Sequence, residues 1–371
     1  MYKAYKYRLY PDEEQKTQLS KTFGCCRFVN NYYLAKRIEL YRTNGETLNY
    51  NQCSKNLTEL KQDKEWLREA DKFALQNSLK DLDKAYKNFF KRVKNGEKPG
   101  FPKFKSKYNS YQSYTTNYTN SNIKVMFDEN LLKLPKITPL KAILHRTFEG
   151  KILSVTVSKT CSDKYYVSVL VEEDIRQLPE NETIIGIDLG LKEFAITSDG
   201  QKYENPKTLK KYEKQCKRAQ KRLSRKQKKS SNRNKQRKKL AKIHEKIANI
   251  RKDYLHKISR EIVNENQVII SEDLNVKGML KNHKLAQAIA DVSWSEFTQY
   301  LTYKSEWYGR TYYKIDTFYP SSQLCHICGY KNAETKNLNV REWICPECDA
   351  KHDRDINAAK NILAKGMKDL A

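Results

Sequence analysis

The segment Ile184-Ile185-Gly186-Ile187-Asp188 is a short apolar run that ends on a carboxylate. An unbroken run of this kind predicts a β-strand that is covered on both faces. A second apolar strand, Gln267–Ser271, is followed directly by Glu272. If the two strands are neighbours, both carboxylates lie at the same edge of one sheet. The sequence therefore predicts a buried sheet with two acids side by side.

A third acid, Asp355, opens the amphipathic segment Asp355–Leu363. A helix packed on the sheet can bring it beside Asp188 and Glu272. Three carboxylates in one place repel one another and are stable only with cations, and such hard oxygen ligands select Mg²⁺ or Mn²⁺. Two such ions about 4 Å apart clamp the attacking and leaving oxygens of a phosphodiester. We therefore expect Asp188, Glu272 and Asp355 to be catalytic and to hold two Mg²⁺ ions.

The alternative for these acids is that each is an ordinary strand-end or cap residue, as most acids in such places are. The composition favours the metal site. Lys and Arg number 72 against 44 Asp and Glu, so the 371-residue chain has a formal net charge of +28. An excess of this size requires a polyanionic partner, which is nucleic acid or, less readily, an anionic membrane. The 25 Tyr residues, against 12 Phe and 4 Trp, also suit stacking on bases.

Four cysteines have the spacing Cys325-x2-Cys328-x16-Cys345-x2-Cys348. This spacing predicts a zinc ribbon in which two thiolate pairs complete a tetrahedron, so the Zn²⁺ is structural. A redox Cys-x-x-Cys pair or unrelated thiols are the alternatives. The other five cysteines are scattered, which is typical of a reduced protein and not of a disulfide framework.

Residues 207–246 contain 19 Lys and Arg and only two acids, a net charge of +17. The segment lacks Gly and Pro, and two long helices broken near 230–232 fit it best. A charge run is often only a solvated face, but solvated faces usually mix signs. We expect these helices to contact a nucleic-acid backbone, through Lys210, Lys211, Lys217, Arg218, Lys221, Arg222 and Arg225.

The first half of the chain mixes strand and helix patterns. Residues 1–10 predict a strand, 13–42 a helix, and 122–175 several closely spaced strands that favour a small barrel or curled sheet. We expect strand 1–10 to join that sheet, so that the helices of 13–95 form an insertion. Ser54 and Asp71 are candidate caps for two of those helices.

The segment 103–121 is rich in Tyr, Ser, Thr and Asn with interleaved basic residues. Its composition is poor in core-forming side chains. We expect it to touch nucleic acid instead of packing inside the protein.

Together these residues resemble the split RuvC motifs of the TnpB family. The likeness is carried by Gly186-Ile187-Asp188-Leu189-Gly190, by Glu272 after a strand, by Pro320-Ser321-Ser322-Gln323 before the first cysteine pair, and by His352-Asp353-Arg354-Asp355-x-Asn357-Ala358 after the second. It extends forward through Phe73-Ala74-Leu75-Gln76-Asn77-Ser78-Leu79 and covers nearly the whole chain. Within it, Asp355 is favoured over Asp353 because it begins the helix and keeps the Asp-x-Asn spacing.

The resemblance implies an α+β multidomain fold. A wedge β-barrel would comprise 1–10 and 96–180, with 11–95 inserted as a helical recognition lobe. A RuvC nuclease domain of RNase H-like fold would follow at 181–371 and carry a zinc ribbon at 318–352. TnpB proteins are transposon-encoded, RNA-guided DNA endonucleases, related to the ancestors of type V CRISPR effectors.

The resemblance also implies the partners. The first is a guide RNA from the transposon's right end, with one protein per guide. The second is target double-stranded DNA that carries a short adjacent motif. The resemblance implies that the protein acts in the cytoplasm of a prokaryote and has no membrane partner. The positions that match motif-reading residues of the family are Tyr50, Ser54, Lys72, Phe73, Gln76, Thr119 and Asn120. Gln and Asn can bond adenine and Phe can meet a thymine methyl, so we expect a T/A-rich motif.

Three other functions would explain part of the sequence. A nuclease-inactive, RNA-guided repressor of the same family would have lost one or more of the three acids, and all are present. A transposase that joins DNA ends would need end-recognition domains, and the sequence shows none. A guide-free RNA-binding protein with a zinc ribbon explains the charge but not the acids.

Overall fold

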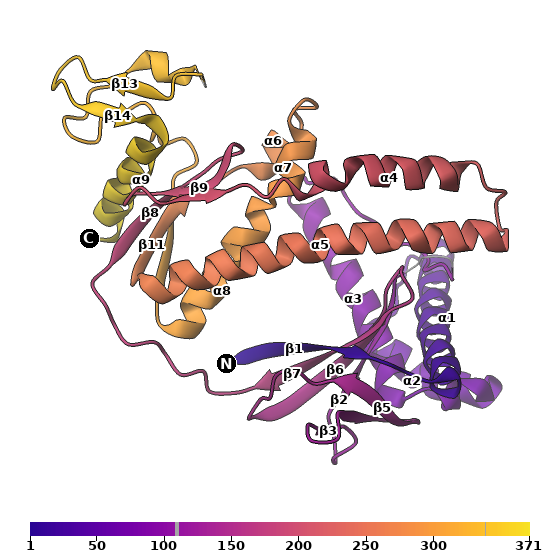
Figure 1. Cartoon of the computed structure of the whole chain (residues 1–371). Helices are drawn as coiled ribbons and strands as arrows, with labels where there is room; N and C mark the ends of the chain where they lie inside the picture. Colours follow the sequence, from indigo (N-terminus) through magenta and orange to yellow (C-terminus); the bar gives the residue numbers. More distant parts are fainter. Residues whose placement is uncertain (108–110, 338) are drawn as a thin grey trace. The chain divides into compact units, whose positions relative to one another are not determined.

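The computed structural model describes residues 1–107, 111–337 and 339–371 (Figure 1). The chain divides into two compact units, Met1–Asp174 and Ile175–Ala371.

The first unit is built on a seven-stranded antiparallel sheet with the order β2-β6-β7-β1-β5-β4-β3. No ladder among the described residues joins β2 to β3, so the sheet is a curled half-barrel. The strands are β1 Tyr2–Leu9, β2 Gln112–Asn117, β3 Lys124–Met126, β4 Leu131–Leu134, β5 Ile137–Ile143, β6 Lys151–Lys159 and β7 Tyr165–Glu172.

The N-terminal strand joins this sheet, as its sequence predicts, and lies in the middle of it. β1 pairs with β7 over its whole length, from Tyr2 opposite Glu172 to Leu9 opposite Tyr165. Its alternate side chains Tyr5, Tyr7 and Leu9 are buried, which is the period of a strand with one face on a core. The expectation that the first strand joins the later ones is therefore confirmed.

Helices lie between β1 and β2 in the chain and pack on the sheet. They are α1 Glu13–Asn44, α2 Tyr50–Asp63, the 3-10 helix η1 Glu65–Glu69 and α3 Lys72–Lys94. Asp71 caps α3 through the backbone N–H of Ala74, as expected, and also accepts a 2.7 Å hydrogen bond from the buried Thr116 hydroxyl of β2. One carboxylate thus starts the helix and ties it to the sheet.

Two local predictions for this unit are wrong: that Ser54 caps a helix, and that the segment 103–121 does not pack inside the protein. Ser54 lies inside α2, because Asn49 and Gln52 form a reciprocal capping box one turn earlier. The segment 103–121 contains β2, where Tyr114 and Thr116 are buried, because an edge strand with one covered face needs few apolar residues. Its residues 108–110 lie outside the described part of the chain.

The second unit contains a five-stranded sheet with the order β10-β9-β8-β11-β12. β8, β11 and β12 are parallel, β9 pairs antiparallel with β8, and β10 pairs antiparallel with the outer side of β9. This mixed order is the RNase H-like arrangement that the family resemblance implies. The strands are β8 Ile184–Leu189, β9 Glu193–Thr197, β10 Lys202–Glu204, β11 Val268–Glu272 and β12 Thr311–Ile315.

Helices cover both faces of this sheet. Ile269 packs with α5 and α8, whereas the next residue, Ile270, packs with α9, as the two-residue period of a strand requires. A Cβ atom on Gly186 would lie 2.2 Å from the carbonyl oxygen of Ala359, so only glycine lets α9 approach β8 this closely. The helices are α4 Thr208–Ser224, α5 Ser231–Glu265, α6 Val276–Met279, α7 Ala286–Val292, α8 Trp294–Tyr308 and α9 Arg354–Leu370.

The basic segment forms a helical hairpin, α4 and α5, and the predicted break is confirmed. Ser230 caps α5 by accepting from the backbone N–H of Arg233. Further along, Ser293 adopts a left-handed conformation with φ 57° and separates α7 from α8. No helix of the described chain combines the length and the apolarity that crossing a membrane requires.

A small ribbon precedes α9 and is drawn in yellow in Figure 1. It consists of the 3-10 helix η2 Ala333–Lys336 and the antiparallel pair β13 Glu342–Ile344 and β14 Lys351–Asp353. Among the described residues, its buried apolar cluster consists of Trp343 with Cys325 and Cys345, and the partly buried Val340 and Cys348 pack against it. A module with so small a core needs another source of stability.

Candidate functional site

Asp188 and Glu272 lie at the carboxyl ends of the neighbouring parallel strands β8 and β11. The register pairs Ile187 with Ser271, so the two acids stand side by side one residue further along. Both are half-buried. The fold thus brings these two predicted residues to one sheet edge.

Asp355 comes from the first turn of α9, which packs across β8, β11 and β12. The helix begins at Arg354, one residue earlier than the sequence suggests. Asp353 is its N-cap and accepts from the backbone N–H groups of Asp355 and Ile356, at 3.0 and 3.2 Å. Its carboxylate also pairs with Lys202 at 2.6 Å. Asp353 is therefore occupied by structural contacts.

The three acids act on one another electrostatically. Burial raises the pKa of Asp188 well above its ordinary value, and the negative charges of Glu272 and Asp355 raise this pKa further. The charge of Arg354 opposes the shift in this pKa but does not cancel it. Burial also raises the pKa of Glu272, against a hydrogen bond from Ser321. The charged forms of Asp188 and Glu272 are therefore disfavoured at this edge unless a cation neutralises them.

A cation already approaches one of the acids. The Arg341 guanidinium lies 3.0 Å from Asp355 Oδ2 and 3.4 Å from Asp355 Oδ1. The arginine side chain is 45 % exposed, so it can move when another cation takes its place. Because the donors are hard carboxylate oxygens that repel one another, they fit Mg²⁺ or Mn²⁺.

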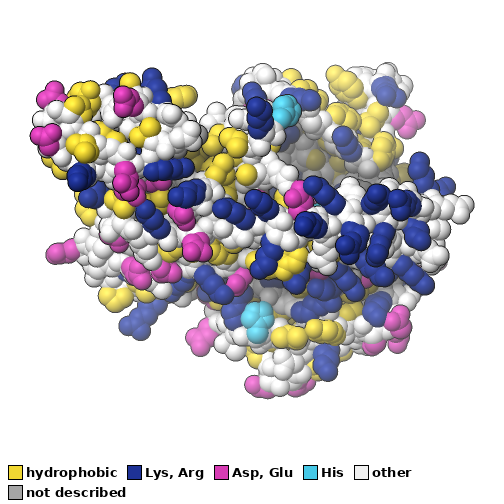
Figure 2. Space-filling model, turned by 45° about the horizontal axis from the view of Figure 1, so that its top comes forward, with side chains coloured by type: hydrophobic (Ala, Val, Ile, Leu, Met, Phe, Trp, Pro, Cys, Tyr) yellow, Lys and Arg dark blue, Asp and Glu magenta, His cyan; other side chains and the backbone are white. Residues whose placement is uncertain are grey.

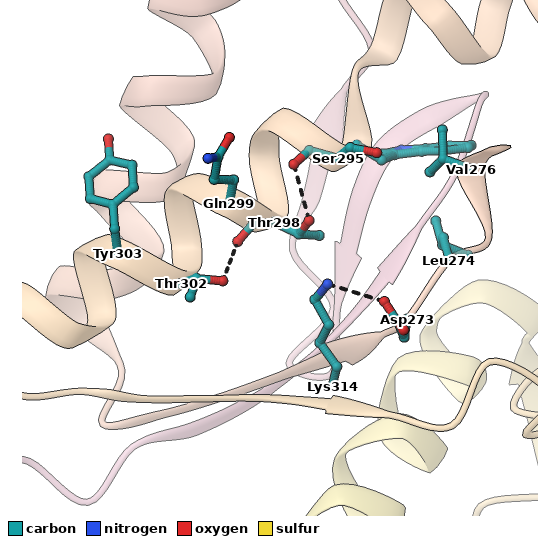
Figure 3. Close-up of a pocket in the computed structure, with 10 residues that line it drawn as sticks. Asp273, Leu274, Val276, Ser295, Thr298, Gln299, Thr302, Tyr303 and Lys314 are labelled. Carbon is teal, nitrogen blue, oxygen red and sulfur yellow. Dashed lines mark hydrogen bonds and ion pairs between the residues drawn. The ribbon is translucent and has the colours of Figure 1, made fainter. Parts of the chain in front are cut away.

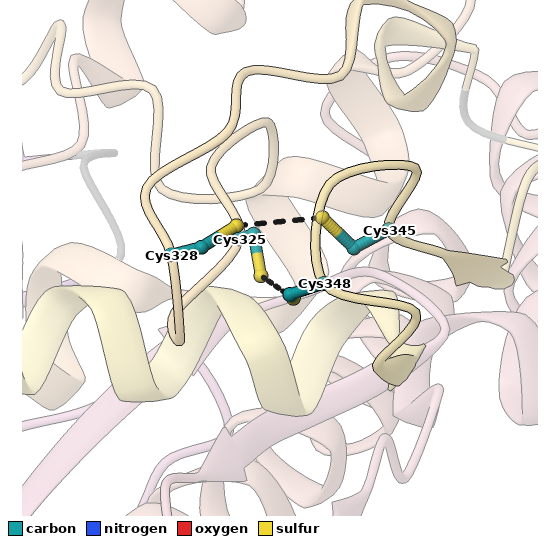
Figure 4. A group of neighbouring side chains, drawn as sticks. All are labelled: Cys325, Cys328, Cys345 and Cys348. Carbon is teal, nitrogen blue, oxygen red and sulfur yellow. Dashed lines mark hydrogen bonds between the residues drawn. The ribbon is translucent and has the colours of Figure 1, made fainter.

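The four cysteines of the ribbon form a ready-made metal site (Figure 4). Their sulfur atoms all lie within 4.8 Å of one another, and two pairs, Cys328–Cys345 and Cys325–Cys348, are 3.5 and 3.7 Å apart. A tetrahedral zinc with Zn–S bonds of about 2.3 Å requires sulfurs about 3.8 Å apart. Zn²⁺ therefore fits this geometry, and the four-sulfur set leaves no ligand position open.

The surroundings of Cys345 favour its thiolate form. Burial by itself raises the pKa of Cys345, but the backbone N–H groups of Glu347 and Cys348 help to lower this pKa to about 7. His352 lies with Nε2 3.1 Å from Cys325 Sγ and its ring centroid 4.7 Å from that of Trp343. His352 is thus a neighbour that packs over the site, and a fifth ligand is not needed.

The helical hairpin exposes its cations. Figure 2 shows dark blue side chains gathered where Figure 1 draws α4 and α5. All seven predicted backbone-contact residues on and after α4 are exposed. Between the helices lies a pocket of about 370 Å³. Its lining includes Arg218 and Arg222 of α4 and two cations that the sequence does not single out, Lys239 and Lys242.

Four of the predicted motif-reading residues line one pocket of the first unit, of about 550 Å³. They are Lys72, Phe73, Thr119 and Asn120. Three further cations line the same pocket, and no sequence pattern marks them. They are Lys61, Arg68 and Lys136.

Tyr50, Ser54 and Gln76 are not part of that lining. Tyr50 lies near the Lys80 ammonium, 5.7 Å from its ring centroid, and Lys80 is one helical turn from Gln76. Gln76 is itself one turn from Lys72. Tyr50, Ser54 and Gln76 are all half-buried, and they lie on the helices that border the pocket.

A separate pocket of about 560 Å³ lies beside the residue that follows Glu272 (Figure 3). Ser295, Gln299 and Thr302 of α8 form one wall. Its two charged residues, Asp273 and Lys314, are paired at 3.1 Å. Because these charges cancel, the pocket has no electrostatic preference for a phosphate.

Comparison with known proteins identifies the family. Models described as "Probable transposase", "Cas12f1-like, TNB domain" and "Helix-turn-helix domain" match residues 166–283, 294–362 and 1–46. In the last range the structure has one strand and one long helix.

Two curated relatives match along nearly their full length. The chain is 41% identical over 371 residues to "Putative RNA-guided DNA endonuclease" of Streptomyces pristinaespiralis, which covers 98% of this chain and 89% of that protein. It is 32% identical over 386 residues to "Putative RNA-guided DNA endonuclease InsQ" of Escherichia coli K12, with 99% and 93% covered.

The fold also matches a cryo-EM structure of a Cas12f1–sgRNA–target DNA complex. The TM-score is 0.58 over 95% of this chain and 83% of that one, at 17% identity, so this likeness concerns the fold. The full-length identities and the transposase model carry the assignment. The chain belongs to the TnpB (OrfB_IS605) family, to which its curated relatives named as RNA-guided DNA endonucleases belong.

Proposed function

We propose that this protein is an RNA-guided DNA endonuclease of an insertion sequence. It uses a guide RNA from the transposon's right end, one protein to one guide, in the cytoplasm of a prokaryotic host. It cuts double-stranded DNA next to a short T/A-rich motif by metal-dependent hydrolysis of a phosphodiester. The observation that carries the proposal is the placement of Asp188 and Glu272 side by side at the ends of β8 and β11, with Asp355 on the helix that packs across these strands.

The chain's own residues have distinct parts in this reaction. Asp188 and Glu272 hold the metal site from adjacent strands, and Asp355 closes it from α9. Bound there, two Mg²⁺ ions supply activation of the attacking water and stabilisation of the leaving oxygen. Arg341 is released from Asp355 and is free to neutralise a phosphate of the scissile strand. Asp353 keeps α9 in place through its cap.

The basic hairpin of α4 and α5 supplies the positive charge that binds a nucleic-acid strand or an RNA–DNA hybrid. We propose that the cations of α4 and α5, including the pocket between the helices, contact phosphates of the guide RNA or of the RNA–DNA hybrid. A hydrogen bond from α4 to α7 fixes the start of α4, which supports this role. Asp291 of α7 accepts from the backbone N–H of Leu209 at 2.9 Å and so caps the start of α4.

Neutralising four lysines of this surface is expected to reduce the salt dependence of nucleic-acid binding. Replacing Lys210, Lys211, Lys217 and Lys221 by Gln should lower the slope of log affinity against log salt by about 3–4, because each phosphate contact releases condensed counterions. Affinities measured across a salt series test this. As control, Lys257, which lies on α5 outside the basic segment 207–246, is replaced and leaves the slope unchanged. An unchanged slope in the quadruple variant would mean that the surface is only solvated.

We further propose that the pocket of the first unit reads the adjacent motif. Phe73 offers an apolar ring to a thymine methyl, and Asn120 offers an amide to a base edge. The cations around the pocket, such as Lys61 and Lys136, hold the flanking phosphates and carry no sequence information.

Gln76 is expected to read one base of the motif. Gln76→Ala should cost about 1–3 kcal/mol of target binding and relax the preference at a single motif position, because an amide bonds adenine at two atoms. Binding to a panel of single-position motif variants measures this. Gln62→Ala, on the exposed side of α2, serves as the matched control. Equal losses at every position, or no loss, would rule out base reading by Gln76.

One experiment tests the proposed function as a whole. The RNA that co-purifies with the protein is sequenced, and the complex is then challenged with plasmids randomised beside a matched target. The proposal predicts one discrete transcript and depletion of plasmids that carry a T/A-rich motif. A heterogeneous RNA pool with no depletion would support a guide-free RNA-binding protein instead.

A further inference from the structure

Glu272 is held by a residue from the base of the ribbon. Ser321 is 5% exposed, and its hydroxyl donates a hydrogen bond to Glu272 Oε1. The two residues are 49 positions apart in the chain. The bond uses one oxygen of the carboxylate and leaves the other for a further contact.

The backbone that carries Ser321 is clamped to α9 by two buried asparagines. Asn361 donates from Nδ2 to the carbonyl oxygens of Ser321 and Leu324, at 2.8 and 2.6 Å. Asn357, one turn earlier, also donates to the Leu324 carbonyl at 2.6 Å, and its Oδ1 accepts from the backbone N–H of His326 at 3.0 Å. Because α9 also carries Asp355, one helix positions two of the three acids.

We propose that Ser321 is a positioning residue for Glu272 in metal binding and cleavage, and that Asn361 fixes Ser321. This inference rests on the proposed nuclease function. The serine and this asparagine touch neither substrate nor metal and act through the glutamate. The base of the ribbon is then part of the nuclease site, in addition to being the start of the zinc module.

The physical reason is the freedom of the glutamate side chain. A glutamate at the end of a strand has several rotatable bonds, and ordering them costs free energy when a metal binds. A hydrogen bond that holds one oxygen removes much of that cost in advance. Partners of this kind, one step away from a metal, typically change metal affinity or activity by 10–100-fold.

The hydroxyl is not needed to hold its own loop. The backbone N–H of Ser321 donates to the Tyr319 carbonyl at 2.8 Å, and the Ser321 carbonyl accepts from Asn361. Both bonds remain when the hydroxyl is removed. Ser321→Ala therefore separates the positioning of Glu272 from the integrity of the loop.

The test compares Ser321→Ala, Ser321→Thr and the control Ser322→Ala in the complex with its guide RNA. Ser322 is the neighbouring half-buried serine, and Glu272 takes its described side-chain bond from Ser321 alone. Mn²⁺ binding is titrated by electron paramagnetic resonance, and cleavage is measured across Mg²⁺ concentrations. We expect Ser321→Ala to weaken Mn²⁺ binding and raise the half-saturating Mg²⁺ by about 10–100-fold. Zinc content, melting temperature and target binding should stay unchanged.

Two further variants sharpen the result. Ser321→Thr keeps the hydroxyl and should restore most of the metal affinity. Asn361→Ala should weaken metal binding in the same direction, and adding it to Ser321→Ala should have little further effect, because both changes act through one bond.

The outcomes separate the two claims. Wild-type Mn²⁺ affinity and Mg²⁺ dependence in Ser321→Ala would overturn the positioning role while leaving the nuclease intact. A Ser321→Ala protein that lost zinc or melted earlier would show a structural role and overturn it too. If the wild type bound no more Mn²⁺ than Asp188→Ala, the nuclease site itself would fail, and this inference with it.

Discussion

Asp188→Ala is expected to abolish DNA cleavage while leaving RNA-guided binding of the target nearly intact. The charges of both Glu272 and Asp355 act on Asp188, so in the proposed metal site its loss would remove a ligand next to both other acids. A fall of at least about a thousand-fold in rate corresponds to about 4 kcal/mol of transition-state stabilisation. Cleavage of a matched plasmid and binding of the same target are measured on one preparation.

The same variant should not melt earlier than the wild type when metal is absent. The pKa of Asp188 is raised in the folded protein, so the folded state holds this proton more tightly than the unfolded chain. Stability from this group is therefore present at low pH and is lost as pH rises above the carboxyl's ordinary pKa of 3.8. The melting temperature of Asp188→Ala should match the wild type in acid and equal or exceed it at neutral pH. Added Mg²⁺ should stabilise only the wild type.

Asp353→Ala is the matched control, two residues before Asp355. Its carboxylate caps α9 and pairs with Lys202, so its loss should cost about 0.5–2 kcal/mol of stability and leave cleavage in the folded protein. Asp188→Ala should thus lose cleavage and keep its stability, whereas Asp353→Ala should lose stability and keep cleavage. Robust residual cleavage by well-folded Asp188→Ala would contradict the assignment of the three acids.

Cys345→Ser is expected to release zinc and unfold the ribbon. Cys345 is fully buried among the four sulfurs, and the cluster around it is too small to stabilise the module alone. Structural zinc contributes about 10–16 kcal/mol in isolated finger peptides, so its loss outweighs the other contacts here. Metal analysis should show less than one zinc per chain, and hydrogen exchange should accelerate over the segment 325–352.

Cys216→Ser is the control for this change, because Cys216 is a buried cysteine of α4 outside the ribbon. It should keep stoichiometric zinc and normal exchange in the ribbon. Full zinc retention by Cys345→Ser would show that the ligand set is wrong.

The sequence predicts much of the second unit because its signals are local. The apolar runs before Asp188 and Glu272 are the strands β8 and β11, and the cysteine spacing leads to a cluster with tetrahedral distances. Uniform charge without Gly or Pro likewise predicts the hairpin of α4 and α5. In each of these cases, the residue types within one short segment are enough to predict its local structure.

Other features depend on contacts between distant residues and leave no local signal. β5 has no uninterrupted strand pattern because Pro139 lies within it, although the strand pairs on both sides with β1 and β4. Ser321 stands in a recognisable motif, but its bond to Glu272 arises only when the base of the ribbon folds against β11. The cations around the first unit's pocket, such as Lys136, come together in the same way.

The most direct test of the proposed nuclease function is DNA cleavage by the protein reconstituted with its guide RNA and Mg²⁺. Plasmids carrying a target that matches the guide, with the selected adjacent motif, are compared with plasmids carrying a scrambled target. We expect linear product only when guide, matched target and Mg²⁺ are all present, and none with Asp188→Ala. Cleavage that ignores the guide sequence, or matched-target binding by the wild type with no cleavage at any Mg²⁺ concentration, would overturn the proposed RNA-guided endonuclease function.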